Sequence, residues 1–199
     1  MIRKIEYVQA GGSEKILNTC RNLVLVGNPG VGKTTFARII HKVLHAYGII
    51  KEDTFVERNG LQLKGEYIGQ TSPKVTAAFD AAHNGTLFLD EAYALNSSNS
   101  NGRRDCFASD AIATLLTECE NRRTSCMVIL AGYEEPMQKL LDADPGLRRR
   151  FPSFINLPDY SPEELGEIAE YVAQNRFDVK METGAKEALT ALIASNHAD

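Results

Sequence analysis

The chain has 199 residues, of which 43% are hydrophobic and 24% charged, and its formal net charge is −4. This length and composition are typical of a globular protein with one sizeable α/β core, and the acidic balance provides no general attraction to nucleic acid or to an anionic membrane. No apolar run approaches the roughly 20 residues of a membrane span, and the N-terminus lacks the apolar core of a signal peptide. We therefore expect a cytoplasmic protein, or an organellar one if a targeting segment has been removed.

The first predicted elements are a strand at 23–26 and a helix that begins near Lys33 and ends before Gly48. Between them the chain reads G-N-P-G-V-G-K-T, the G-x-x-x-x-G-K-T spacing of a phosphate-binding loop. Its glycines let several backbone N–H groups point at one polyphosphate, Lys33 would reach the β- and γ-phosphates, and the Thr34 hydroxyl would hold Mg²⁺. A chance glycine-rich turn is the alternative, but the flanking strand and helix favour nucleotide binding. The predicted nucleotide-binding residues are Gly27, Asn28, Pro29, Gly30, Val31, Gly32, Lys33, Thr34 and Thr35.

Histidines and cysteines offer little sign of a metal site. His41 and His45 lie four residues apart on the predicted helix, but no third ligand is evident, and we expect a solvated helix face. The four cysteines contain no C-x-x-C pair and are expected to be free thiols in a reducing compartment.

Short apolar strands alternate with helices along the first 157 residues. Strands are predicted at 23–26, 54–57, 86–89, 127–131 and 154–157, with helices at 33–47, 72–83, 107–122 and 134–142. This alternation predicts a five-stranded parallel sheet with helices on both faces, and the second helix, at 72–83, is expected to start at an N-cap Ser72. From 158 onward the pattern contains two helices, about 161–176 and 182–195, the first with Ser161 as N-cap. We therefore predict a nucleotide-binding domain at 1–157 and a helical domain at 158–199.

Two acidic residues end the predicted strand at 86–89. Ligands of open α/β sheets lie at the carboxyl ends of the strands, so Asp90 and Glu91 should emerge beside the phosphate loop. Asp90 would hold Mg²⁺, and Glu91 would orient and deprotonate the attacking water. An acidic pair after a strand is by itself usually a solvated turn. Because this pair follows a complete phosphate loop by about sixty residues, it predicts an ATPase.

Two further segments carry hypotheses about partners. Arg148 and Arg150 lie in a basic segment that we expect to be a turn. Either arginine could neutralise charge on a γ-phosphate bound by a neighbouring subunit, and such a shared site implies a ring. The alternative is a basic surface turn without a role in catalysis. Tyr67 and Ile68, between Gly65 and Gly69, could grip a polypeptide without reading its sequence, although ordinary packing is the commoner role of such residues.

Together these residues resemble an AAA+ ATPase module, and more closely the family of CbbX (red-type Rubisco activase) and stage V sporulation protein K, which also includes ATPases of type VII secretion. The matching stretches are N-L-V-L-V-G-N-P-G-V-G-K-T-T-F-A-R (22–38), G-E-Y-I-G-Q-T-S-P-K (65–74), G-T-L-F-L-D-E-A-Y-A-L (85–95), V-I-L-A-G-Y (128–133) and D-P-G-L-R-R-R-F-P with its downstream P-D-Y-S-P-E-E-L (144–165). The resemblance covers roughly residues 20–199.

The resemblance implies a sheet of order 5-1-4-3-2, ATP and Mg²⁺ as cofactors, and a homo-hexameric ring in which a pore loop carrying Tyr67 pulls on a protein substrate. We expect no nucleic-acid or membrane partner, because the chain is acidic and lacks a basic, aromatic-rich segment. The resemblance also implies that Arg150, or else Arg148, is the arginine finger, whereas Tyr133 stands where many AAA+ proteins have a polar sensor.

The family's lid continues into a further arginine-bearing helix, and the chain ends at Asp199 before it, so we expect a partial lid, weaker ATP binding and poor ring assembly. The alternative to a remodelling ATPase is a nucleotide-dependent switch or assembly scaffold with little turnover.

Overall fold

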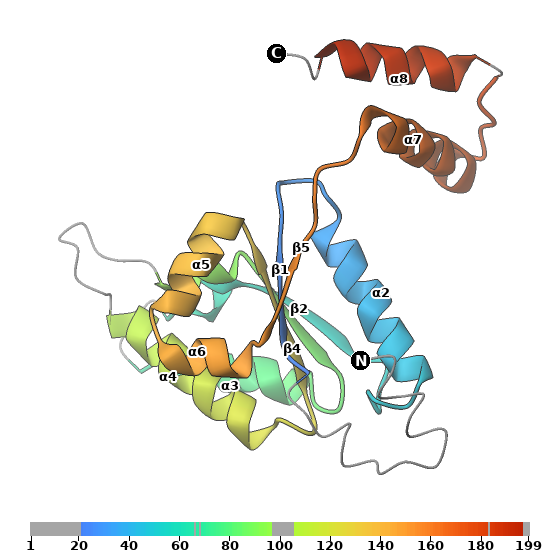
Figure 1. Cartoon of the computed structure of the whole chain (residues 1–199). Helices are drawn as coiled ribbons and strands as arrows, with labels where there is room; N and C mark the ends of the chain where they lie inside the picture. The colour runs from blue at the N-terminus through green and yellow to red at the C-terminus, as the bar shows by residue number, and fades with distance from the viewer. Residues whose placement is uncertain (1–20, 66, 68, 97–105, 183, 197–199) are drawn as a thin grey trace. The chain divides into compact units, whose positions relative to one another are not determined.

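The computed structural model describes residues 21–65, 67, 69–96, 106–182 and 184–196 (Figure 1). The chain divides into two compact units between Leu157 and Pro158: an α/β unit and a unit of two helices.

The α/β unit is built on one parallel sheet whose strand order is β2-β3-β4-β1-β5. This is the predicted order 5-1-4-3-2 read from the other edge, and the expectation of a five-stranded P-loop sheet is confirmed. The three central strands are almost fully buried and mostly apolar, as expected of parallel strands that are covered on both faces. The strands are β1 (Leu23–Val26), β2 (Phe55–Asn59), β3 (Thr86–Asp90), β4 (Met127–Gly132) and β5 (Ser153–Asn156).

Helices cover both faces of this sheet (Figure 1). On one face α2 (Lys33–Ala46) packs through Ala37 and Leu44 on residues of β1, β3 and β4. The other face carries four helices, whose buried residues form the larger apolar cluster with the opposite side chains of the same strands. They are α3 (Thr71–Ala81), α4 (Cys106–Asn121), α5 (Glu134–Asp142) and α6 (Pro145–Arg150).

Two predicted boundaries are wrong. The helix α3 begins at Thr71, not after an N-cap at Ser72, and its N-cap Gln70 makes no side-chain capping bond. The Thr71 hydroxyl instead accepts a hydrogen bond from the Gly65 N–H (3.0 Å), which ties the start of α3 to the preceding loop. The expected basic turn at Arg148 is the short helix α6, because Asp144 accepts a bond from the Gly146 N–H (2.7 Å) and Pro145 occupies the first turn.

The expectation that His41 lies on a solvated helix face is also wrong, because its side chain is only 2% exposed. One ring nitrogen lies 2.9 Å from the Thr86 hydroxyl and the other 3.0 Å from the Asp53 carboxylate. The imidazole therefore links α2 to the start of β3 and to the loop before β2. No group of three His, Cys, Asp or Glu side chains within the described ranges could hold a metal ion.

The remaining elements are short. Two 3-10 helices follow β2 and β3, namely η2 (Gly60–Leu63) and η3 (Ala92–Asn96), and neither was predicted. In the second unit, α7 (Pro162–Phe177) starts at Ser161, whose hydroxyl and Glu164 form a reciprocal capping box. It packs closely against α8 (Ala185–Asn196) at Gly166, where a Cβ atom would lie 2.4 Å from the Thr190 hydroxyl.

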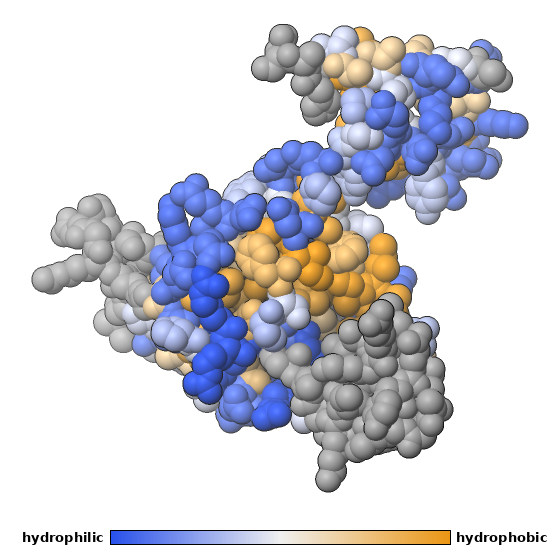
Figure 2. All heavy atoms as spheres, in the orientation of Figure 1, coloured by the Kyte–Doolittle hydropathy of each residue, from blue (hydrophilic) through white to orange (hydrophobic). Residues whose placement is uncertain are grey.

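Apolar side chains also reach the surface of the α/β unit, where Figure 2 shows them over α2 and β5. Ile39, Val43 and Tyr47 recur every four residues along the outer face of α2, and Phe154 is exposed on β5. No helix in the described part of the chain combines the length and apolar character that a membrane crossing requires.

Candidate functional site

The loop between β1 and α2 has the backbone geometry of an anion cradle. Gly30 and Gly32 both have φ of +83°, a left-handed conformation that favours glycine, and Gly32 is the N-cap of α2. The Lys33 ammonium folds back over the loop and donates to the carbonyl oxygens of Gly27 (2.9 Å) and Asn28 (2.8 Å). A bound polyphosphate would offer Lys33 charged oxygen acceptors in place of these carbonyls.

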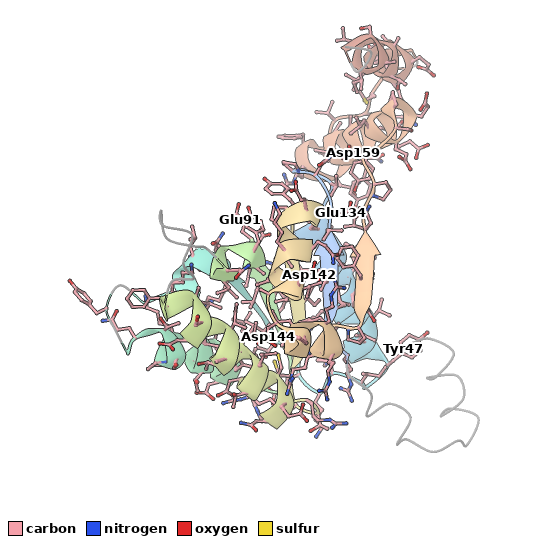
Figure 3. The ribbon with its side chains drawn as sticks, turned by 60° about the vertical axis from the view of Figure 1, so that its left-hand side comes forward. Tyr47, Glu91, Glu134, Asp142, Asp144 and Asp159 are labelled. Carbon is pink, nitrogen blue, oxygen red and sulfur yellow. The ribbon has the colours of Figure 1, made fainter. Side chains whose placement is uncertain are left out.

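A pocket of about 360 Å³ opens beside this loop, at the carboxyl ends of β3 and β4. The end of β3 contributes both acidic residues, and Figure 3 shows Glu91 at this edge of the α/β unit, the edge at which Glu134 begins α5. The structure therefore brings the phosphate loop and the acidic pair together. The pocket is lined by Pro29, Gly30, Gly32, Lys33, Thr34, Thr35, Asp90, Glu91, Tyr93, Gly132 and Tyr133.

Glu91 is held in an unusual position. Its φ of +48° is left-handed, which costs a non-glycine residue roughly 1–2 kcal/mol, and its N–H donates to the Asp90 carboxylate (3.0 Å). The Glu91 carboxylate in turn accepts a hydrogen bond from the Asn59 side-chain amide (2.8 Å). Asn59 was not predicted from the sequence, although it ends β2 in register with Asp90, next to the edge where the ligand was expected.

Two tyrosines form the wall of the pocket between Lys33 and Glu91. The rings of Tyr93 and Tyr133 stack with 5.7 Å between their centroids, and the Lys33 Nζ lies 5.6 Å from the centre of the Tyr133 ring. Burial raises the pKa of Tyr93, and so do the neighbouring charges of Glu91 and Asp90. Tyr93 was not predicted, and Tyr133 was noted only as an unusual residue at a sensor position.

The pocket residues fit a magnesium–nucleotide complex. The Thr34 hydroxyl and the Asp90 carboxylate both line the pocket, and Mg²⁺ prefers oxygen ligands of this kind. Two protein oxygens leave most of an octahedral shell to water and phosphate oxygens, which is how Mg²⁺ is usually held together with a nucleotide.

The family profile of AAA, the ATPase family associated with various cellular activities, matches residues 23–159. The chain belongs to this family. EccA1, an ESX-1 secretion system protein, is 37% identical over 92% of this chain in Mycolicibacterium smegmatis and 41% identical over 83% of it in Mycobacterium tuberculosis. EccA3 of Mycobacterium leprae, an ESX-3 secretion system protein, is 40% identical over 96% of the chain.

The chain spans about a third of the length of these relatives, 32% of the first and 29% of the other two. One chain of a solved structure, the E. coli MS115-1 HORMA:CdnC:Trip13 complex, superposes on this chain with a TM-score of 0.61. The match covers 90% of this chain and 60% of that one, at 20% sequence identity, and it supports the fold alone. The α/β unit is therefore an AAA ATPase domain.

In this AAA domain the two candidate arginine fingers lie away from the pocket. Neither is among its lining residues; Arg148 is paired with Asp142, and Arg150 contacts Glu120 (3.3 Å). Figure 3 shows Asp142 and Asp144, which lead into the arginine helix α6, farther along the unit than Glu91 and Glu134. The structure therefore does not bring Arg148 or Arg150 to the pocket of their own chain.

The proposed substrate-gripping residues lie in the loop between η2 and α3. The Tyr67 side chain is 69% exposed, so it is not a packing residue of this domain. Ile68 lies outside the described residues.

Proposed function

We propose that this AAA domain hydrolyses ATP with Mg²⁺ to drive the remodelling of a protein substrate within a ring-shaped assembly of copies. The observation that carries the proposal is the convergence of Lys33, Thr34, Asp90 and Glu91 on one pocket. A lysine and a helix N-terminus provide positive charge for the phosphates, whereas the two carboxylates have separate tasks.

Each residue has a chemical role that follows from its position. Lys33 would leave the Gly27 and Asn28 carbonyls to bind phosphate oxygens, and Thr34 and Asp90 would hold the metal ion, which would neutralise phosphate charge. Glu91 accepts the proton of the attacking water, because it is the other carboxylate at the pocket edge. Asn59 donates to the Glu91 carboxylate, so the amide must release it before it acts as a base.

We propose that Arg150, or else Arg148, completes the pocket of a neighbouring copy in a homo-hexameric ring. The support is that both lie on α6 outside their own pocket, and that the Arg148 side chain is 51% exposed against 27% for Arg150. The test mixes Glu91→Gln with Arg150→Ala, and in parallel with Arg148→Ala. Glu91→Gln and the variant of the true finger are each expected to be inactive alone, while their mixture forms some sites with both wild-type groups and regains turnover. Mixtures that stay inactive at all ratios would contradict a shared site.

We propose that the exposed Tyr67 grips the substrate polypeptide, with Ile68 beside it. The relatives are named as secretion system proteins, which favours a protein as the molecule acted on. The test is stimulation of ATP turnover by an unfolded protein such as casein. Tyr67→Ala should lose the stimulation and keep the basal rate, whereas Tyr171→Ala, which removes an equally exposed tyrosine (67%) from the helical unit, should keep both. Stimulation that survives Tyr67→Ala would contradict this role.

Finer assignments rest on the same motifs. We propose membership of the CbbX and stage V sporulation protein K family. We also propose that residues 158–199 form part of a helical lid domain, which the two-helix unit of α7 and α8 supports. A cytoplasmic location stays a prediction. The alternative, a nucleotide-dependent switch with little turnover, is favoured by one observation, the engagement of Glu91 by Asn59.

A further inference from the structure

We propose that Thr71 and Lys74 of α3 are positioning residues for the substrate contact at Tyr67, because they tie down the base of the loop that presents this side chain. The inference rests on the proposed grip of Tyr67 and adds two residues to it. Tyr67 is 69% exposed, whereas Thr71, four residues later, is only 1% exposed. A buried polar side chain needs a hydrogen-bond partner inside the protein, and the partner of Thr71 lies at the other end of the loop.

The two residues hold one peptide group from both sides. The Thr71 hydroxyl accepts a hydrogen bond from the Gly65 N–H (3.0 Å), and the Lys74 ammonium donates one to the Lys64 carbonyl oxygen (2.9 Å). This N–H and this carbonyl belong to the same peptide unit, the one that joins Lys64 to Gly65. Rotation of that peptide unit would break both bonds, so α3 fixes the direction in which the chain enters the loop.

The backbone at Tyr67 folds tightly against this fixed point. A Cβ atom at Gly65 would lie 2.9 Å from both the Tyr67 carbonyl oxygen and Cβ of Gln70, closer than real Cβ atoms come to other heavy atoms. The Tyr67 carbonyl also accepts a hydrogen bond from the Gln70 N–H (3.2 Å). The position of Tyr67 therefore depends on the peptide unit that Thr71 and Lys74 hold.

The segment before the loop packs against the turn that carries the proposed base. A Cβ atom at Gly60, the first residue of η2, would lie 2.6 Å from the Glu91 carbonyl oxygen. At the other end of η2, Leu63 is buried in the apolar core, and Lys64 follows it directly. The short helix η2 thus joins the Glu91 turn to the held peptide unit, so stimulation of hydrolysis by substrate should depend on that unit staying in place.

The test measures how much casein is needed to stimulate ATP turnover. The casein concentration that gives half-maximal stimulation does not depend on how many molecules are active, so partial loss of folded protein does not shift it. Thr71→Val removes the hydroxyl and keeps the shape of the side chain, Thr71→Ser restores the hydroxyl, and Lys74→Met removes the ammonium. Two matched controls remove such groups elsewhere: Thr117→Val, whose hydroxyl bonds within α4, and Lys139→Met, whose ammonium pairs with Glu135 within α5.

A positioning role predicts a specific pattern. Thr71→Val should raise the half-maximal casein concentration about 5-fold, the value of one ordinary hydrogen bond, and Lys74→Met should raise it at least as much because its donor is charged. Thr71→Ser and the two controls should match the wild type. The KM for ATP should stay at the wild-type value in all variants, since neither Thr71 nor Lys74 lines the nucleotide pocket, whereas damage that spreads through the domain would change it as well.

A wild-type half-maximal concentration in Thr71→Val, or an equal shift in Thr71→Ser, would overturn the inference and leave the proposed function standing. If casein does not stimulate the wild type although it hydrolyses ATP, the proposed grip of Tyr67 fails and the inference falls with it. If the wild type does not hydrolyse ATP, the proposed catalysis fails instead, and the affinities of the same variants for fluorescein-labelled casein, measured by anisotropy, decide the inference.

Discussion

Replacing Gly132 by alanine tests the pocket wall without removing any group that contacts nucleotide. The added Cβ would meet the Tyr93 ring at 2.8 Å and the Met137 side chain at 2.9 Å. Met137 is fully buried, so it cannot retreat, whereas Tyr93 is only partly buried and is the side chain that must move. Overpacking of this kind costs about 1–3 kcal/mol, which in a domain of this size lowers the melting temperature by roughly 2–10 °C.

Tyr93 lines the pocket together with Glu91, so its displacement reshapes the pocket wall, and ATP turnover should fall about tenfold or more in Gly132→Ala. The assay pairs thermal unfolding, followed by circular dichroism, with steady-state ATP hydrolysis. Gly48→Ala is the control: its φ is +69° and nothing lies within 4 Å of an added Cβ, so it should cost a comparable 1–2 kcal/mol from backbone strain alone.

The two variants should therefore differ in turnover and not in stability. If Gly132→Ala loses stability and hydrolyses ATP as Gly48→Ala does, the position of the Tyr93 ring in the pocket wall does not matter for hydrolysis. If Gly132→Ala loses neither stability nor activity, the pocket wall is looser than the contact distances indicate, and the packing argument is wrong.

Three further outcomes follow from the structure. Ser161→Ala should lower the stability of the helical unit by about 1 kcal/mol through loss of its capping box, with Ser195→Ala as a neutral control, as measured by hydrogen exchange of α7. Lys33→Ala should weaken ATP binding at least tenfold, whereas Lys42→Ala, on the exposed side of α2, should not, as measured by calorimetry. Burial raises the pKa of the Cys126 thiol to about 12, so the folded state keeps its proton from about pH 9 to 12 while the unfolded state loses it. Stability should therefore fall as pH rises through this window, by roughly 1–2 kcal/mol at pH 10, and urea midpoints of Cys126→Ala should lack that part of the decline.

The sequence predicted what depends on local pattern. The aliphatic runs of β1, β3 and β4, the glycine spacing of the loop and the acids after β3 are contiguous signals, and all lie where they were expected. The sheet order came from the resemblance, since strand order is not encoded in any one segment.

The errors concern contacts between distant segments. His41 reads as a surface residue because its partners Asp53 and Thr86 lie 12 and 45 residues away. Asn59 follows no motif; its contact with Glu91 exists only because the ends of β2 and β3 lie side by side in the sheet. The short helix α6 depends on its N-cap Asp144, and six residues are too few for a clear helical pattern in the sequence.

The most direct test of the account is Mg²⁺-dependent ATP hydrolysis by the wild type, Glu91→Gln and Glu134→Gln, measured over a range of protein concentrations. Glu134 lies at the same edge as Glu91, outside the pocket lining, and is its matched control. The account predicts that Glu134→Gln keeps the wild-type rate, and that Glu91→Gln binds ATP normally and hydrolyses it at least about 100-fold more slowly. Hydrolysis by Glu91→Gln at the wild-type rate would contradict the assignment of Glu91 and the mechanism built on it.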